Sequence, residues 1–123
     1  MARKKDQERE DRIVMEIVVD AHDEEERAMG WYCYLENTIA FPFTAQCTIQ
    51  RSISPLSKGD EVEVIDLASS DECGHEMFVM IRWDRKEGLG VPLSQLKPGG
   101  DADDATRQAV EDWLYWVKEG YAF

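Results

Sequence analysis

A helical pattern of apolar positions runs from Asp23 toward Phe43. Acidic residues open it, and Asp23 and Glu26 have the spacing of a helix capping box. Pro42 lacks a backbone N–H and holds the residue before it in an extended conformation, so the helix must end before this proline. The predicted buried face repeats at intervals of three and four residues and consists of Ala28, Tyr32, Leu35 and Ile39, widened by Met29 and Trp31.

After Pro42 the pattern changes to short apolar or alternating runs that are separated by polar turns. Residues 61–65 alternate polar and apolar side chains, as a half-buried strand does, and residues 77–83 form a longer apolar run. Polar stretches between the runs predict loops or turns at 54–60, 68–76 and 84–90. The predicted strands are 44–49, with Cys47 and Ile49 on one side, and 61–65, 77–83 and 91–93.

Helices are also predicted near both ends of the chain. Residues 13–21 fit a helical face, although Ile17-Val18-Val19 favours a strand locally, and we favour a helix that breaks near Asp20. The last helix is capped by Asp103 or Asp104. Its predicted stripe and end are Val110, Trp113, Leu114, Val117 and Gly120, with Tyr121 and Phe123 packed onto the body.

These elements favour an α+β fold in which a small SH3-like β-barrel is flanked by the central helix and the C-terminal helix. Residues 56–64 resemble the turn that feeds such a barrel, and residues 91–96 resemble the strand and helical turn that end one. Many unrelated functions use this barrel, so the fold alone assigns none of them. The expected organisation is a flexible charged tail, 1–12, followed by a single domain, 13–123.

The formal net charge of −12 narrows the possible functions. The first twelve residues hold five basic and four acidic side chains, so the negative charge lies on the domain. Such a surface repels nucleic acid and anionic membranes and concentrates cations. The alternative is that the acidic residues serve only to keep the protein soluble. No apolar run is long enough to cross a bilayer, and the N-terminus lacks the apolar core of a signal peptide, so a cytoplasmic protein is expected.

Two groups of hard oxygen donors suit a cation such as calcium. Glu36, Asn37 and Thr38 lie at the end of the central helix, where the dipole is negative and backbone carbonyls lack helical donors. Asp71 and Glu72 lie in the acidic loop before the third predicted strand. In both places the alternative is a solvated acid at the end of an element.

Other metal and catalytic motifs are weak. Residues 101–112 begin like an EF-hand loop, but Thr106 stands in place of the turn glycine and Asp112 in place of the closing glutamate, so helix capping explains these acids better. Cys73 and His75 do not have zinc-finger spacing, and no nucleophile motif is present. An enzyme is therefore not expected. The alternatives are an SH3-like peptide-binding module without a metal and a thiol-dependent or zinc enzyme.

A set of residues within and after the central helix resembles a known family. The combination of Gly30-Trp31-Tyr32, Tyr34-Leu35 and Phe41-Pro42-Phe43 is similar to the CcbP-type small calcium-binding proteins described from cyanobacteria. The resemblance implies an acidic protein that binds calcium through sites unrelated to EF-hands. It also implies a key ligand directly after Glu36, where family members often carry aspartate and this chain carries Asn37. An amide oxygen still binds calcium, but the lost charge lowers the affinity.

The sequence therefore predicts a non-EF-hand, non-catalytic calcium-binding protein that acts as an intracellular buffer or sensor. The predicted Ca²⁺ ligands are Glu36, Asn37 and Thr38, with Asp71 and Glu72 completing the shell. Calcium ions are the expected partner, nucleic acid and membranes are not, and no protein partner is assigned.

Overall fold

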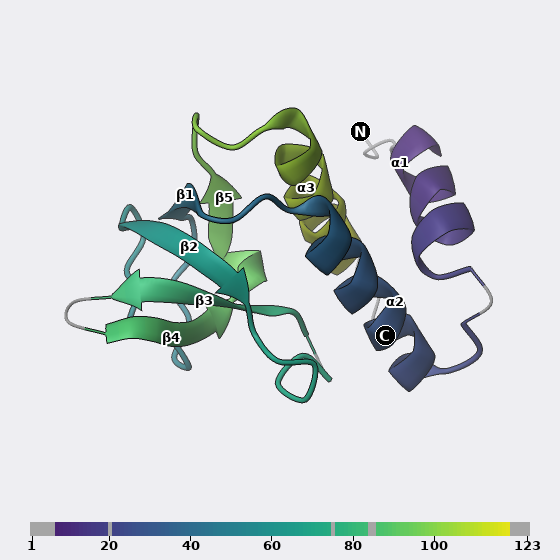
Figure 1. The fold of residues 1–123 in the computed structure, drawn as a ribbon, viewed down its shortest axis with the longest axis horizontal. Coiled ribbons are helices and arrows are strands. Elements are labelled where there is room, and N and C mark those ends of the chain that lie inside the picture. Colours follow the sequence, from purple (N-terminus) through teal and green to yellow (C-terminus); the bar gives the residue numbers. More distant parts are fainter. Residues whose placement is uncertain (1–6, 20, 75, 84–85, 119–123) are drawn as a thin grey trace, which may run out of the picture.

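The computed structural model describes residues 7–19, 21–74, 76–83 and 86–118. A five-stranded antiparallel sheet lies on one side of the molecule and the helices lie on the other (Figure 1). The strands are β1 (Phe43–Cys47), β2 (Glu61–Leu67), β3 (Phe78–Trp83), β4 (Lys86–Pro92) and β5 (Leu96–Pro98). The α+β class is thus confirmed. The SH3-like barrel is not confirmed, because the strand order β4-β3-β2-β1-β5 leaves this sheet open, with β4 and β5 at its edges.

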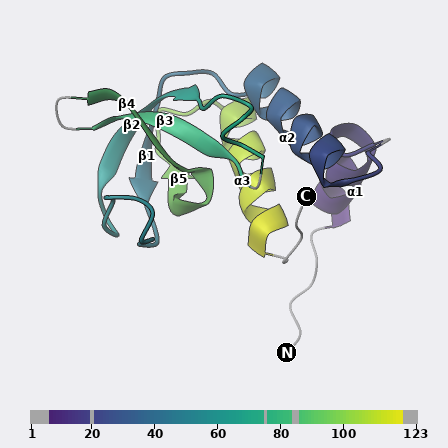
Figure 2. The ribbon, with the colours of Figure 1, turned by 90° about the horizontal axis from the view of Figure 1, so that it is seen from below.

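The predicted central helix is α2, and its N-terminus forms as its sequence requires. The carboxylate of Asp23 accepts a hydrogen bond of 2.8 Å from the backbone N–H of Glu26, and the helix ends four residues before Pro42. In Figures 1 and 2 alike, α1 lies farthest from the sheet. No helix among the described residues is long and apolar enough to cross a membrane. The helices are α1 (Gln7–Arg12), the π-helical η1 (Ile13–Ile17), α2 (Glu24–Thr38), the 3₁₀-helical η2 (Leu93–Gln95) and α3 (Asp104–Lys118).

Three tryptophans form the contact between α2 and α3. Trp31 is 0% exposed, and its ring centroid lies 5.1 Å from that of Trp113 and 5.8 Å from that of Trp116. Tilted and edge-to-face pairs at these distances stabilise packing beyond the area that they bury. These three tryptophans therefore belong to the core.

A buried carboxylate joins all three α-helices. Asp112, on α3, is 0% exposed and accepts hydrogen bonds from the guanidinium of Arg12 at 2.6 and 3.1 Å. The Nε of Arg9 lies 3.0 Å from the same carboxylate, and the hydroxyl of Tyr34, on α2, donates to it at 2.8 Å. The hydrogen bond to Asp112 raises the pKa of Arg12, which keeps this partner charged. The charge of Asp112 is thus buried with opposite charge and hydrogen bonds around it, as burial of a carboxylate requires.

Gly30 allows η1 to approach α2. A Cβ atom at this position would lie 2.3 Å from the carbonyl oxygen of Ile17, a distance that real side chains do not tolerate. The close approach lets Ile13 and Ile17 enter the core, where they are 0% and 4% exposed. Glycine is needed here for its small size.

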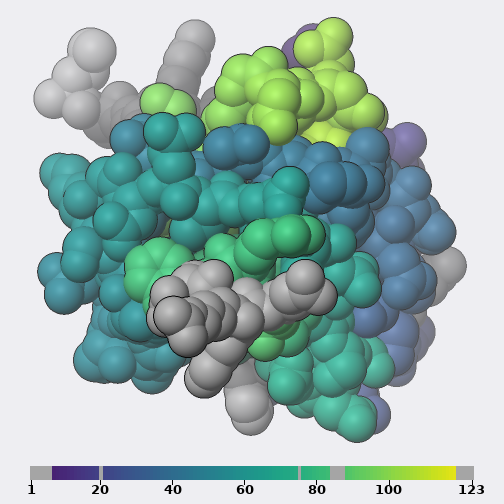
Figure 3. Space-filling model, turned by 60° about the vertical axis from the view of Figure 1, so that its left-hand side comes forward, coloured from purple at the N-terminus to yellow at the C-terminus, as the bar shows by residue number. Residues whose placement is uncertain are grey.

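The sheet differs from the predicted strands at its edges. β1 ends at Cys47, so the predicted strand 44–49 is two residues too long at its end, and Ile49, expected on the same side as the buried Cys47, is 51% exposed. β4 begins within the predicted turn 84–90 and ends within the predicted strand 91–93, and the sequence predicts no strand at β5. The strands and their connecting loops make up most of the face shown in Figure 3.

Several predictions fall wholly or partly on residues outside the described structure. These residues include Asp20, His75, Gly120, Tyr121 and Phe123. Within the predicted tail, 1–12, the described residues Gln7–Arg12 are helical and belong to α1.

Replacing the buried carboxylate should destabilise the fold strongly. Asp112→Asn leaves two guanidiniums facing a neutral amide, and loss of one member of a buried ion pair costs about 3–5 kcal/mol. Glu111→Gln is the matched control, because Glu111 is exposed on the same helix, 3.5 Å from Arg9, and such surface pairs contribute less than about 1 kcal/mol. Urea unfolding of both variants measures the difference. Equal losses of stability would contradict the role of Asp112.

Tyr34 should make part of the stability depend on alkaline pH. Burial and the hydrogen bond to Asp112 raise the pKa of Tyr34 from 10.0 to about 12. Because the folded pKa is the higher one, this contribution is complete below pH 10 and is lost as the pH rises toward 12. The unfolding free energies of the wild type and Tyr34→Phe should therefore converge between neutral pH and about pH 11. A difference that does not change with pH would refute the prediction.

Candidate metal centre

The end of α2 presents backbone carbonyls without their usual helical donors. The N–H of Ile39 donates to the carbonyl of Leu35 at 3.0 Å, but the N–H of Ala40 donates instead to the hydroxyl of Thr106 at 2.8 Å. The carbonyl of Glu36 therefore lacks its helical donor, and so does that of Thr38, because the residue four positions later is Pro42. These oxygens lie at the negative end of the helix dipole, which favours a cation.

Glu36 lies one turn after Tyr32, whose hydroxyl contacts the residue that follows β2. The hydroxyl of Tyr32, one turn earlier on α2, donates to the carbonyl of Ala68 at 2.9 Å. Burial raises the pKa of Tyr32, and the charges of Glu36 and Asp66 raise it further, so both carboxylates lie within electrostatic reach of this hydroxyl. Carboxylate, hydroxyl and carbonyl oxygens thus gather where α2 faces the end of β2.

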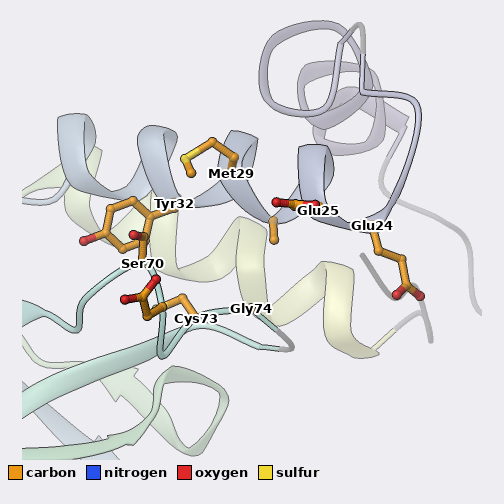
Figure 4. Close-up of a pocket in the computed structure, with 9 residues that line it drawn as sticks. Glu24, Glu25, Met29, Tyr32, Ser70, Cys73 and Gly74 are labelled. Atoms are coloured by element: carbon orange, nitrogen blue, oxygen red, sulfur yellow. The ribbon is translucent and has the colours of Figure 1, made fainter.

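Asp71 faces the opposite end of α2. A cavity of about 400 Å³ lies between the first half of the helix and the loop 70–74, and Asp71 lines it together with Glu24 and Glu25. Figure 4 shows Met29 and Tyr32 on the helix above Ser70 and Cys73 on the loop. Asp71 and Glu36 therefore adjoin different parts of one long face of α2.

The remaining predicted ligands are at the surface. Asn37 is exposed and Thr38 is half-buried at the end of α2. Glu72 is exposed beside Asp71, and its charge, after burial of the thiol, helps to raise the pKa of Cys73. The five predicted ligands thus form a helix-end group and a loop group.

The donor types fit calcium better than a soft metal. Every side chain of the two groups offers oxygen, which hard cations prefer. Across residues 7–19, 21–74, 76–83 and 86–118, no three His, Cys, Asp or Glu side chains lie close enough together to hold an ion. Calcium bound at the helix end would therefore need amide, carbonyl, hydroxyl or water oxygens in addition to its carboxylates.

The acids of the rejected EF-hand motif have structural partners. Asp103 accepts from the N–H of Thr106 at 2.7 Å and caps α3, and hydrogen bonding with the side chain and then the backbone of Thr106 lowers the pKa of Asp103. Asp101 accepts from the N–H and hydroxyl of Thr44, and Asp112 is the buried carboxylate described above. Capping and packing thus account for these three acids.

Sequence reasoning did not identify the role of Glu24, Glu25 and Ser70 in lining the cavity. The first two were interpreted only as acids at the positive end of a helix. Their neighbours did carry a pattern, because Glu25, Met29, Tyr32 and Glu36 recur at intervals of four, three and four residues and so share one helical face. Nothing in the sequence indicated that the loop 70–74 would pack beside this face.

Comparison with known proteins supports the family resemblance. A family model described as calcium binding, that of the CcbP type, matches residues 11–117. The crystal structure of Anabaena CcbP has a TM-score of 0.85 and 40% identity, covering 99% of this chain and 98% of that one. A calcium-binding protein in its calcium-binding form has a TM-score of 0.81 and 42% identity, with 100% of both chains covered. No curated protein matches the chain. The match to the family model and the likeness of nearly the whole fold show that this chain belongs to the CcbP-type family of calcium-binding proteins.

Proposed function

We propose that this protein binds calcium reversibly in the cytoplasm, without catalysis, as a buffer or a sensor. The family to which it belongs is a calcium-binding one, and the protein is acidic, with a formal net charge of −12. A surface with this field raises the local concentration of divalent cations and disfavours nucleic acid and anionic membranes as partners.

The end of α2 is the proposed calcium site. Glu36 supplies a carboxylate, Asn37 an amide oxygen and Thr38 a hydroxyl, beside carbonyls that lack helical donors. A bound cation would itself balance the negative end of the helix dipole, so this end needs no basic side chain nearby. The observation that carries the proposal is the N–H of Ala40, which donates to Thr106 and so leaves the carbonyl of Glu36 available.

Asp71 and Glu72 are proposed to contribute from the loop by attracting the ion through their negative charge. Their exposed side chains lie on the loop that packs along the same helix. Few charges and flexible side chains suit a site of modest affinity, with a Kd of roughly micromolar to millimolar. Such a site would exchange calcium readily, as a buffer or a sensor requires.

Asn37→Asp should tighten calcium binding. The substitution adds a charged oxygen ligand at the helix end, and we expect the Kd to fall roughly five- to tenfold. Calorimetry with calcium and with magnesium, on chelator-treated protein, measures the change. Gln46→Glu is the matched control, because it converts an exposed amide to a carboxylate on β1. No heat and no melting shift with the wild type at millimolar calcium would remove the proposal, and equal effects of both variants would remove the site.

Asp71→Asn should weaken calcium binding if the loop contributes to the site. Loss of a carboxylate from the loop that packs along α2 should raise the Kd about two- to fivefold, more than loss of a charge elsewhere on the domain does. Asp104→Asn is the control, since Asp104 is exposed in the first turn of α3 and its loss changes the net charge equally. Titrations at physiological ionic strength compare the two variants. Indistinguishable affinities would exclude the loop and leave the helix end as the site.

A further inference from the structure

The cavity between α2 and the loop 70–74 has an apolar wall and an acidic rim. Ala28, Met29 and Tyr32 form the wall on the helix, and Met29 is 51% exposed. Glu24 and Glu25 line the cavity from the first turn of α2, and Asp71 lines it from the loop. The volume of about 400 Å³ is large enough for a long side chain together with part of its backbone.

The three carboxylates of this rim are left without a partner by the part of the chain that the structure describes. Among the described residues, none of Glu24, Glu25 and Asp71 takes part in an ion pair or a side-chain hydrogen bond. By contrast, Glu76 pairs with Arg51 at 2.8 Å and Glu63 pairs with Arg82 at 2.9 Å. The rim therefore presents carboxylates that do not stabilise the described part of the fold through ion pairs.

The spread of the carboxylates favours an extended cation over a bare ion. They border a cavity, yet no three acids in the described parts of the chain come close enough together to hold a metal. A guanidinium distributes its charge over a plane and binds carboxylates through several N–H donors. Its aliphatic stem also gains from contact with a thioether and an aromatic ring, which a metal ion does not.

We propose that this cavity is a docking site for a basic segment of a partner protein, which inserts an arginine side chain between α2 and the loop 70–74. The guanidinium meets Glu25 and Asp71, and the stem lies along Met29 and Tyr32. Charge complementarity carries the choice of partner, because the cavity is acidic within a domain that is itself strongly negative. This inference goes beyond calcium binding and does not require it.

The test is fluorescence anisotropy of labelled hexa-arginine with the full chain in the presence of a chelator. The double variant Glu25→Gln, Asp71→Asn should weaken binding by at least about tenfold. The control Glu61→Gln, Asp104→Asn also neutralises one glutamate and one aspartate, with Asp104 in the first turn of its helix as Glu25 is. This control should weaken binding by less than about twofold. Equal losses would show that only the net charge attracts the peptide, and would overturn the proposal.

The apolar wall gives a second, independent comparison. Met29→Ala should weaken binding by about threefold, whereas Met15→Ala should leave it unchanged, because Met15 is an equally flexible side chain, 67% exposed, on η1. Both positions are exposed, so neither substitution is expected to impair folding. An unchanged affinity of Met29→Ala would contradict insertion along this wall.

Three further outcomes would also overturn the assignment. They are the absence of wild-type binding to hexa-arginine, equal binding of the uncharged hexa-citrulline, and complete displacement of the peptide by spermine at equal charge concentration. The last result would assign the cavity to a small polyamine. Calcium calorimetry on the wild type separates this test from the proposed function, since a wild type that binds calcium but not hexa-arginine refutes only the docking site.

Discussion

The arrangement of the helices depends on the buried carboxylate of Asp112. α1 has no buried residue of its own, and polar contacts hold it, through Arg9 and Arg12 to Asp112 and through Glu10 to Tyr115. Tyr34 brings α2 to the same carboxylate. A charge in this position is tolerated only with all of its partners in place, so the three helices must assemble together. Once they do, the rotation of α2 is fixed, and its acidic face is directed toward the segment 66–74.

The structure divides the acidic residues into those that support the fold and those left for external cations. Asp23 and Asp103 cap helices, Asp60 accepts from the N–H of Ser57, and Asp101 fixes Thr44. The acids of the candidate sites are different, because they lie along one side of α2 and form no ion pair within the described parts of the chain. The net charge therefore overestimates the number of acids that can bind a cation, because only this smaller group is left for external cations.

Local signals were sufficient for much of this fold. The capping pair Asp23 and Glu26, the apolar repeat and Pro42 located α2 closely, because each acts through the backbone of neighbouring residues. The first part of β4 was predicted as a turn, since strand pairing across the sheet outweighs weak local propensity at Gly88 and Gly90. The candidate site was predicted only in part. The placement of Glu36 and Asn37 could be predicted from where the helix ends. Asp71 and Glu25 line one cavity only because of the path of the loop 70–74, which no local pattern predicts.

The packing contact at Gly30 is separate from the residues that are proposed to bind cations or partners. The contact with Ile17 concerns only the backbone and the size of one residue, and it lies apart from the carboxylates that line the other side of α2. Substituting those carboxylates would alter which ions or partners are attracted while leaving the junction of the helices undisturbed. The architecture is thus modular in a practical sense: its ligand preference is open to redesign through surface residues, with the packing of the N-terminal arm held constant.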